Sequence, residues 1–518
     1  MTYRVHQKNK KTGVVYVYEA TAVWDKEKKQ PRNKQVCIGK IDPDTGEFVP
    51  SKRLDPKQAA ARDPEVTAIS KVVGPELLLD SVTEKLELRN TLKACFPGFY
   101  KQILSLAQFL ACRGGALSHF ETWSKSHSHC YADPLTTQRI SEILNNIDEN
   151  SMQAFFKRWA RKTMENDYLC YDITSVSSYS ELNEYLRYGY NRDGEKLKQI
   201  NLAMLFGQNS RLPVFYRRLP GNISDVSTLH NFLDTFSFLE LPQMSLAMDK
   251  GFFSQNNIDA LFAVKDRFTI AVPTRVKWLQ EFIDSMDGSI QSPQNYLKTN
   301  GETLYVHSEK FVWGENRKRC HLHVYYNAHL AADAFDGFTE ELLDYKKELE
   351  ENRLVAAHEK AYSDYFIISE TPVRGRKIKF NDEVIQKHRK KYAGYFAILS
   401  NDIKDPVKAL EVYRNKDCVE KCFDDLKNQL DMKRLRVHSS RTMDGRMFVQ
   451  FIALIYTSAL RKALKEAELE NQYTVRELIG ETETISRIEY SGKYGHIITE
   501  MTRSQKQIFE KLGIQMQS

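Results

Sequence analysis

The chain has 518 residues, of which 42% are hydrophobic and 11% aromatic, and its 75 Lys/Arg and 68 Asp/Glu give a formal net charge of +7. This composition can supply large apolar cores and excludes a wholly disordered chain, and a mean hydropathy of −0.52 argues against a membrane protein. At roughly 150 residues per domain, the length predicts three to four domains.

The small positive charge is concentrated in three stretches of the chain. Residues 1–57 hold 13 Lys/Arg against 7 Asp/Glu, residues 373–391 hold eight against two, and residues 427–446 hold six against two. Such basic patches suit a polyanionic partner such as nucleic acid, although a solvated basic surface has the same composition.

Residues 1–75 predict a small, β-rich, basic module. Apolar residues alternate through Val14–Tyr18 and Val36–Ile41, and Asp44–Gly46 predicts a turn. The N-terminus has no apolar h-region, so we expect no secretory signal and a cytoplasmic protein. The eight scattered cysteines form no Cys-x-x-Cys pair, which is typical of reduced thiols in the cytosol.

Residues 76–165 have helical periodicity. Within them, Thr136–Ile147 and Ser151–Trp159 resemble a helix-turn-helix that could read DNA, but ordinary helical packing is the favoured interpretation because short helix pairs are common. His127–Cys130 and Cys320–His323 contain metal-ligand residue types without a second half at zinc-finger spacing. Structural side chains are the simpler interpretation of both groups.

Residues 166–274 change to an α/β pattern. Strands are predicted from apolar and β-branched runs, and helices are predicted after Ser224 and over Gln255–Ala263. The expected order of strands and helices indicates a mixed sheet covered by helices. The predicted strands are Tyr168–Ile173, Leu197–Phe206, Leu212–Leu219, Met244–Met248 and Phe268–Val272.

Residues 275–395 interrupt this pattern, with extended runs at Thr303–His307 and His321–Tyr326 and a charged helix at Thr339–Glu351. A strand is then predicted at Tyr395–Leu399, and the α/β pattern resumes in residues 396–465.

The C-terminal part of the chain is predicted to be helical. One unbroken helix is expected from about Asp405 to Asp431. The apolar stretch Met447–Leu460 is too short and too interrupted for a membrane span and fits a buried helix, and we expect residues 466–518 to be helical as well.

Four residues of the predicted Asp405–Asp431 helix share one of its faces. At 100° per residue, Tyr413, Lys416, Glu420 and Lys427 fall within about 60°, beside the apolar stripe. Such a row suits an active site, and it also suits a solvated flank of a packed helix.

Two aspartates follow strand-like runs. Asp172 and Asp249 would lie toward the carboxyl ends of strands, where open α/β sheets usually place their chemistry, although each alone also fits a cap or a turn. Three carboxylates from separate elements are the ligands that a two-metal phosphoryl-transfer site needs. The sequence contains no Walker A loop, dinucleotide fingerprint, Gly-x-Ser-x-Gly elbow or His-Glu-x-x-His motif.

The helix row resembles the Tyr-Arg-Glu-Lys signature of bacterial insertion-sequence transposases with a ribonuclease H-like DDE domain. Tyr171–Ser175 resembles the first-Asp strand of that family, and Leu246–Phe252 is similar to its second-Asp segment. The resemblance covers about residues 165–460. One residue departs from the signature, because its Arg is Lys416 here, which keeps the charge but lacks the planar bidentate fork.

The resemblance implies a multidomain α/β fold. A ribonuclease H-like mixed-sheet core, in residues 166–274 and 396–465, would be split by a mostly β insertion in residues 275–395. The 171 positions from Asp249 to Glu420 leave room for that insertion. The β-rich N-terminal module and helical N- and C-terminal regions would complete the chain.

The resemblance also implies Mg²⁺-dependent cut-and-paste DNA transposition. Asp172, Asp249 and Glu420 would be catalytic and would ligate two Mg²⁺ ions, for which Mn²⁺ can substitute. A water would nick the element end, and the freed 3′-hydroxyl would attack the opposite strand or target DNA. The residues expected to bind DNA are Tyr413, Lys416, Lys427, Arg434, Arg436 and His438. Trp278 and Trp313 are candidates for stacking on a flipped base, with core packing as the alternative.

The expected partners are double-stranded DNA, in the form of terminal inverted repeats and target, and a second copy of the chain in the DNA complex. We expect no membrane and no small-molecule substrate, and association with the bacterial nucleoid when DNA is bound. Residues 1–165 would carry most end-specific recognition. Two alternatives remain open, a ribonuclease H-like nuclease without strand transfer and a catalytically inactive DNA-binding descendant.

Overall fold

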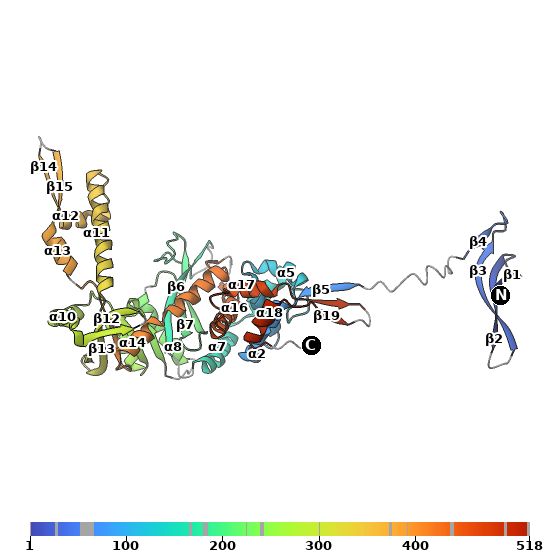
Figure 1. Cartoon of the computed structure of the whole chain (residues 1–518), viewed down its shortest axis with the longest axis horizontal. Helices are drawn as coiled ribbons and strands as arrows, with labels where there is room; N and C mark the ends of the chain where they lie inside the picture. The colour runs from blue at the N-terminus through green and yellow to red at the C-terminus, as the bar shows by residue number, and fades with distance from the viewer. Residues whose placement is uncertain are drawn as a thin grey trace. The chain divides into compact units, whose positions relative to one another are not determined.

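The computed structural model describes residues 2–25, 30–51, 67–164, 168–179, 185–223, 225–238, 243–299, 301–371, 375–390, 392–435, 440–491 and 495–514 (Figure 1). The chain divides into two compact units. The first comprises Met1–Ser70 with Arg487–Thr499, and the second comprises Lys71–Ser486 with Glu500–Ser518. The finer domain boundaries expected from the sequence stay predictions.

The first unit contains an antiparallel sheet in the order β1-β2-β3-β4. A β-bulge leaves Ile38 of β3 without a partner between the pairs Val17–Gly39 and Tyr18–Cys37. Val17 and Ala20 of β2 are buried. The two alternating runs predicted as strands lie in β2 and β3, and both predictions are confirmed. The strands are β1 (Thr2–Lys8), β2 (Val15–Asp25), β3 (Gln30–Ile41) and β4 (Phe48–Pro50).

A second sheet has the order β19-β18-β5, formed by β19 (His496–Ile498), β18 (Ser486–Tyr490) and β5 (Ala68–Val72). The prediction that residues 466–518 are all helical is therefore wrong for this part. The hairpin gains a third strand from a segment about 400 residues earlier, so no local pattern reveals its pairing. In the sequence, α17 (Val475–Thr482) precedes this hairpin and α18 (Arg503–Lys511) follows it.

Helices fill the second unit from Gly74 to Thr163, as predicted. Thr136 and Asp148 cap α6 and α7, each accepting a hydrogen bond from the amide three residues later. Their apolar faces are used in packing, since Phe156 of α7 contacts the rings of Phe215 and Phe448. The helices are α2 (Gly74–Lys85), α3 (Leu88–Cys95), α4 (Tyr100–Arg113), α5 (Phe120–Ser126), α6 (Thr137–Asn146) and α7 (Glu149–Thr163).

The long helix α16 (Ser440–Glu466) forms the centre of this packing. Among the described helices it alone is long and apolar enough to cross a membrane, but 78% of its most apolar window is buried inside the protein. Phe448 and Ile452 are fully buried. These properties are those of a core helix, as predicted for the apolar stretch Met447–Leu460.

The main sheet has the order β11-β12-β13-β16-β10-β9-β6-β7-β8, and β17 also pairs with β6. The strands β6, β9 and β10 run parallel to one another, while β7, β8 and β16 are antiparallel to their neighbours. Each strand predicted between Tyr168 and Val272 is confirmed. The strands are β6 (Tyr168–Ser178), β7 (Gln199–Gly207), β8 (Pro213–Pro220), β9 (Ser245–Met248), β10 (Arg267–Val272), β11 (Tyr296–Thr299), β12 (Glu302–Trp313), β13 (Lys318–Tyr326), β16 (Tyr395–Ser400) and β17 (Arg434–Leu435).

The helices α8 (Asp225–Phe238) and α9 (Gln255–Ala263) connect these strands, as predicted. Ser254 caps α9, because its side chain accepts a hydrogen bond from the Asn257 amide.

The prediction of a mostly β segment over residues 275–395 is wrong in its proportion. Its strands β11, β12 and β13 extend the main sheet, but α11 is 23 residues long, starting at an Asn327 cap followed by an alanine-rich turn. Leu342 and Leu349 of α11 pack with Phe366 in a small cluster of their own. The other elements are α10 (Lys277–Ser285), α11 (Ala328–Glu350), α12 (Glu359–Tyr365), β14 (Phe366–Thr371), β15 (Gly375–Phe380) and α13 (Asp382–Lys390).

The single helix predicted over Asp405–Asp431 is wrong as well. Helix α14 (Pro406–Arg414) ends at Asn415, and α15 (Asp417–Asp424) leads into η6 (Asp425–Gln429), a π-helical turn. Asp425 in this turn is buried and paired with Arg461 of α16. The ion pair between Asp425 and Arg461 accompanies the π-helical turn. Beyond this turn, a helical wheel at 100° per residue no longer describes which residues share a face.

Candidate active site

Strand pairing places Asp172 and Asp249 next to each other. In the parallel register of β6 and β9, Tyr171 pairs with Met248, so the two aspartates occupy the next position along their strands. Asp172 lies within β6 and Asp249 directly follows β9, and both are half-buried. Asp249 therefore lies at the carboxyl end of its strand, as predicted, whereas β6 continues for six residues beyond Asp172, to Ser178.

Contacts made by Tyr413 and Lys416 place Glu420 of α15 near Asp172 and Asp249. The Tyr413 hydroxyl donates a 2.8 Å hydrogen bond to Asp249 Oδ1. Lys416, in the turn between α14 and α15, donates from Nζ to Glu420 Oε1 at 2.8 Å. The Glu420 side chain is 57% exposed, while that of Lys416 is only 17% exposed, so the carboxylate faces outward over a sheltered ammonium.

Lys416 lies within electrostatic reach of all three carboxylates. Burial lowers its pKa, but the hydrogen bond to Glu420 and the charges of Asp249, Glu420 and Asp172 outweigh that effect and raise the pKa. Burial also raises the pKa of Tyr413, and the charge of Asp249 adds to the rise, so the phenol donates to the carboxylate as a neutral group. The structure thus brings together Asp172, Asp249, Glu420, Tyr413 and Lys416.

Burial and neighbouring charges shift the pKa of Asp172. Burial raises its pKa to about 6, and the charge of Asp249 acts in the same direction. The Ile173 amide, which donates to Asp172 Oδ1 at 2.8 Å, and the cations of Arg192 and Lys416 oppose the rise. Two crowded acidic groups of this kind are characteristic of sites where a cation or a proton is handled.

The donor set fits a hard divalent cation, because carboxylate oxygens are the ligands that Mg²⁺ prefers and a cation would relieve the repulsion between Asp172 and Asp249. The three carboxylates do not form a ready-made ligand cluster. Within the described part of the chain, no group of three or more His, Cys, Asp or Glu side chains is arranged to hold a metal. Tyr413 and Lys416 instead occupy oxygens of Asp249 and Glu420.

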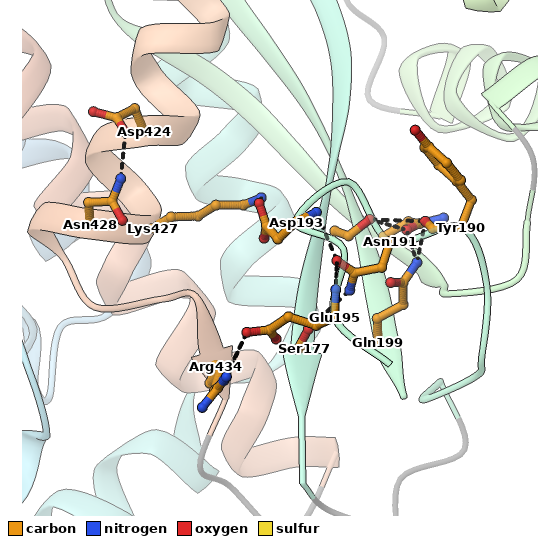
Figure 2. A network of polar contacts seen from close by, with 12 residues as sticks. Ser177, Tyr190, Asn191, Asp193, Glu195, Gln199, Asp424, Lys427, Asn428 and Arg434 are labelled. Carbon is orange, nitrogen blue, oxygen red and sulfur yellow. Dashed lines mark hydrogen bonds and ion pairs between the residues drawn. The ribbon is translucent and has the colours of Figure 1, made fainter. Parts of the chain in front are cut away.

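Two of the cations that follow Glu420, Lys427 and Arg434, are paired within the protein. Lys427 Nζ contacts both carboxylate oxygens of Asp193, at 2.9 and 2.7 Å, and Arg434 donates to Glu195. Figure 2 shows both contacts meeting one loop, the connection between β6 and β7. The remaining predicted DNA-binding residues, Arg436 and His438, lie outside the described residues.

Sequence reasoning missed Arg192, Asp193 and Glu195. The local signal was the sequence Asn-Arg-Asp-Gly-Glu, in which Asn191 and Gly194 predict a turn that exposes charged neighbours. The partners of Asp193 and Glu195 are more than 230 positions away in the chain, so the sequence alone could not identify the ion pairs.

The two tryptophans proposed for base stacking take part in aromatic packing. Trp278 packs on Phe311 with ring centroids 4.8 Å apart, and Trp313 is 7% exposed and donates from Nε1 to Asp259 at 2.8 Å. These contacts favour the core-packing interpretation.

The histidine and cysteine groups considered as zinc ligands also have structural partners. His127 stacks on Trp123 and contacts Glu483 at 2.9 Å. His323 contacts the Ser308 hydroxyl at 2.7 Å.

Comparison with known proteins identifies the family. The family model described as "Transposase DDE domain" matches residues 164–456, whereas no curated protein matches. A solved cryo-EM structure of a piggyBac transposase synaptic complex with hairpin DNA is similar at 9% identity and a TM-score of 0.36, over 78% of this chain and 70% of that chain. Because the family match covers more than half of the 518 residues and includes Asp172, Asp249 and Glu420, the chain belongs to the DDE transposase family.

Proposed function

We propose that this protein catalyses Mg²⁺-dependent cut-and-paste transposition of an insertion sequence, nicking the element ends and joining the freed 3′-hydroxyl to target DNA. The observation that carries the proposal is the parallel register of β6 and β9, which sets Asp172 beside Asp249. Glu420, which accepts a hydrogen bond from Lys416, is the third carboxylate. A bacterial, nucleoid-associated location and a homodimer on DNA belong to the same proposal.

The sheet order supports a ribonuclease H-like core. Such a core has three antiparallel strands followed by two parallel ones, and β8-β7-β6-β9-β10 follows that arrangement. The first acidic residue then lies on the central strand β6 and the second at the end of its parallel neighbour. We propose that β16, β13, β12 and β11 extend this core rather than form a separate sheet.

The side chains have distinct roles in the proposed reaction. Asp172, Asp249 and Glu420 would hold two Mg²⁺ ions, which, when bound, activate the attacking oxygen and stabilise the leaving oxygen. The Tyr413 hydroxyl orients the Asp249 carboxylate, and Lys416 orients Glu420 through their 2.8 Å contact. Lys416, Lys427 and Arg434 would bind phosphates of the element end.

The proposal is tested with the full chain and a plasmid that carries its gene with the native flanking DNA on both sides. We expect Mg²⁺-dependent release of the element and its recovery at new sites. Nicking of the plasmid without joined products would favour the nuclease alternative, and DNA binding without any cleavage would favour the inactive descendant. Either of these two results would overturn the proposal.

The departure from the family signature gives a prediction for Lys416→Arg. A guanidinium can bind a phosphate through two parallel hydrogen bonds, whereas the ammonium acts as a point charge. We expect the Mg²⁺-dependent nicking rate to rise about fivefold, equivalent to about 1 kcal/mol. Lys421→Arg, at an exposed position of α15, is the control and should leave the rate unchanged. A lower rate in Lys416→Arg would show that the pairing with Glu420 matters more than phosphate contact.

A further inference from the structure

A tight turn in the connection between β6 and β7 presents two carboxylates toward the segment that follows Glu420. We call Asn191–Glu195 the Asn191 turn. Asn191 Oδ1 accepts hydrogen bonds from the Asp193 amide at 2.8 Å and the Glu195 amide at 3.2 Å. Gly194 has a φ of +71°, a conformation that glycine adopts without strain, and its amide donates to the Asn191 carbonyl. The backbone of the turn therefore fixes its own shape.

Side chains of the main sheet brace the turn. Asn191 Nδ2 donates to Ser177 Oγ at 3.1 Å, and Gln199 Nε2 donates to the Tyr190 carbonyl at 2.9 Å (Figure 2). Ser177 and Gln199 are both fully buried. Because these partners belong to β6 and β7, the two carboxylates are held in place relative to Asp172 on β6.

Each carboxylate of the turn is paired with one cation. Asp193 accepts both of its contacts from Lys427, and the two side chains are 22% and 11% exposed. Glu195 Oε1 accepts from Arg434 Nε at 3.1 Å and Nη2 at 2.7 Å, and Tyr179 accepts from Nη1 of the same guanidinium at 2.6 Å. Lys427 and Arg434 are the cations expected to bind DNA phosphates, so both are neutralised within the protein.

The charged side chains of the Asn191 turn have the same signs as the groups expected near them in a DNA complex. Asp193 and Glu195 put negative charge on Lys427 and Arg434, where phosphates are expected. Arg192, between Asn191 and Asp193, puts positive charge near Asp172, one of the proposed metal ligands. A phosphate that approached Lys427 in this state would meet the repulsion of Asp193, and solvent screens that repulsion weakly because the pair is mostly buried.

We propose that the Asn191 turn is a built-in competitor for DNA, whose Asp193 and Glu195 carboxylates occupy the phosphate sites at Lys427 and Arg434 until the DNA backbone displaces them. This inference rests on the proposed function, because it assumes that the segment after Glu420 faces DNA. Both ion pairs must open for full binding. DNA held by many other contacts supplies that energy, and DNA held by few contacts does not, so the turn favours element ends over arbitrary DNA.

The test measures the affinity of the full chain for a duplex of arbitrary sequence, without metal, over a range of salt concentrations. In Asp193→Asn/Glu195→Gln we expect affinity to rise about tenfold at low salt. In the wild type, a Lys427 or Arg434 side chain that binds a phosphate releases a salt cation from the DNA. The carboxylate that this side chain leaves then binds a salt cation from solution, so release and uptake cancel. The log–log salt slope of the double variant should therefore steepen by up to about 0.9 for each cation freed, or about 1.8 in total.

Matched variants separate competition from general charge and from misfolding. Asp336→Asn/Glu340→Gln removes two exposed charges from α11 and should change affinity much less. Asp193→Glu keeps the charge and should bind like the wild type. Glu195→Gln alone disturbs the more exposed pair, since Arg434 is 43% exposed, and should steepen the slope by about 0.9 even if the Asp193 variants fold poorly.

Unchanged or weaker binding in the folded double variant, with an unchanged slope, would overturn the inference and show that the carboxylates position Lys427 and Arg434 instead. Failure of the proposed function has a different signature. A wild-type chain that cuts no DNA with Mg²⁺ refutes the transposase activity, whereas the competition is judged from binding without metal.

Discussion

Asp249→Asn should lower the rate of Mg²⁺-dependent DNA cleavage by at least about 10³-fold while DNA affinity without metal stays within a few-fold of wild type. The asparagine keeps an oxygen that can accept the Tyr413 hydrogen bond, so the loss comes from the charge of the ligand rather than from misplacement of α14. Metal ions supply several kcal/mol of transition-state stabilisation, and about 4 kcal/mol corresponds to this change in rate. The measurement is a single-turnover nicking assay on the plasmid that carries the native flanks.

The control for this prediction is Asp402→Asn. Asp402 also accepts a 2.8 Å hydrogen bond from a tyrosine hydroxyl, that of Tyr168, but Tyr168 begins β6, four positions before Asp172. We expect the cleavage rate of this variant to match that of the wild type. Equal rates for Asp249→Asn and the wild type would remove Asp249 from the mechanism.

Gly445→Ala should lower the free energy of unfolding by about 1–3 kcal/mol, although alanine normally stabilises a helix relative to glycine. Gly445 lies in α16, where a Cβ atom would come within 2.1 Å of the Leu144 carbonyl oxygen and 2.7 Å of its carbon. These are backbone atoms at the end of α6, so α6 and α16 must move apart to admit the methyl group. The buried apolar faces of both helices would lose contact.

Gly480→Ala in α17 provides the opposite case. This helical glycine is exposed and has no heavy atom within 4 Å of the added Cβ position. We expect the same substitution to stabilise the protein by roughly 0.5–1 kcal/mol. Denaturant unfolding of the two variants with the wild type tests both values, and a Gly445→Ala protein as stable as the wild type would contradict the close helix crossing.

Local sequence patterns predicted the parts of the fold whose cause is local. The strands at Asp172 and before Asp249 begin in apolar runs and were both predicted, although β6 continues to Ser178, beyond the predicted end at Ile173. The end of β9 also predicted the position of Asp249, whereas Asp172 lies within β6. The family resemblance contributed the role of Glu420, which spacing alone left between a site and a solvated flank.

Long-range contacts account for what the sequence could not predict. The π-helical turn after α15 contains Asp425, whose partner Arg461 is 36 positions away. The predicted row of residues on one helix face therefore does not extend to Lys427, which lies in that turn. The pairing of β18 with β5 and the ion pairs of the Asn191 turn join segments separated by more than 230 residues. A periodicity argument considers one element at a time and does not include such pairs.

The central claim is that Asp172, Asp249 and Glu420 together perform metal-dependent strand transfer. The most direct measurement incubates the full chain and Mg²⁺ with supercoiled plasmid and a duplex that ends at the last nucleotide of the element with a free 3′-hydroxyl. The account predicts covalent joining of the duplex to the plasmid, and loss of joining when any one of the three carboxylates is replaced by its amide. Joining that persists in all three amide variants would contradict the account.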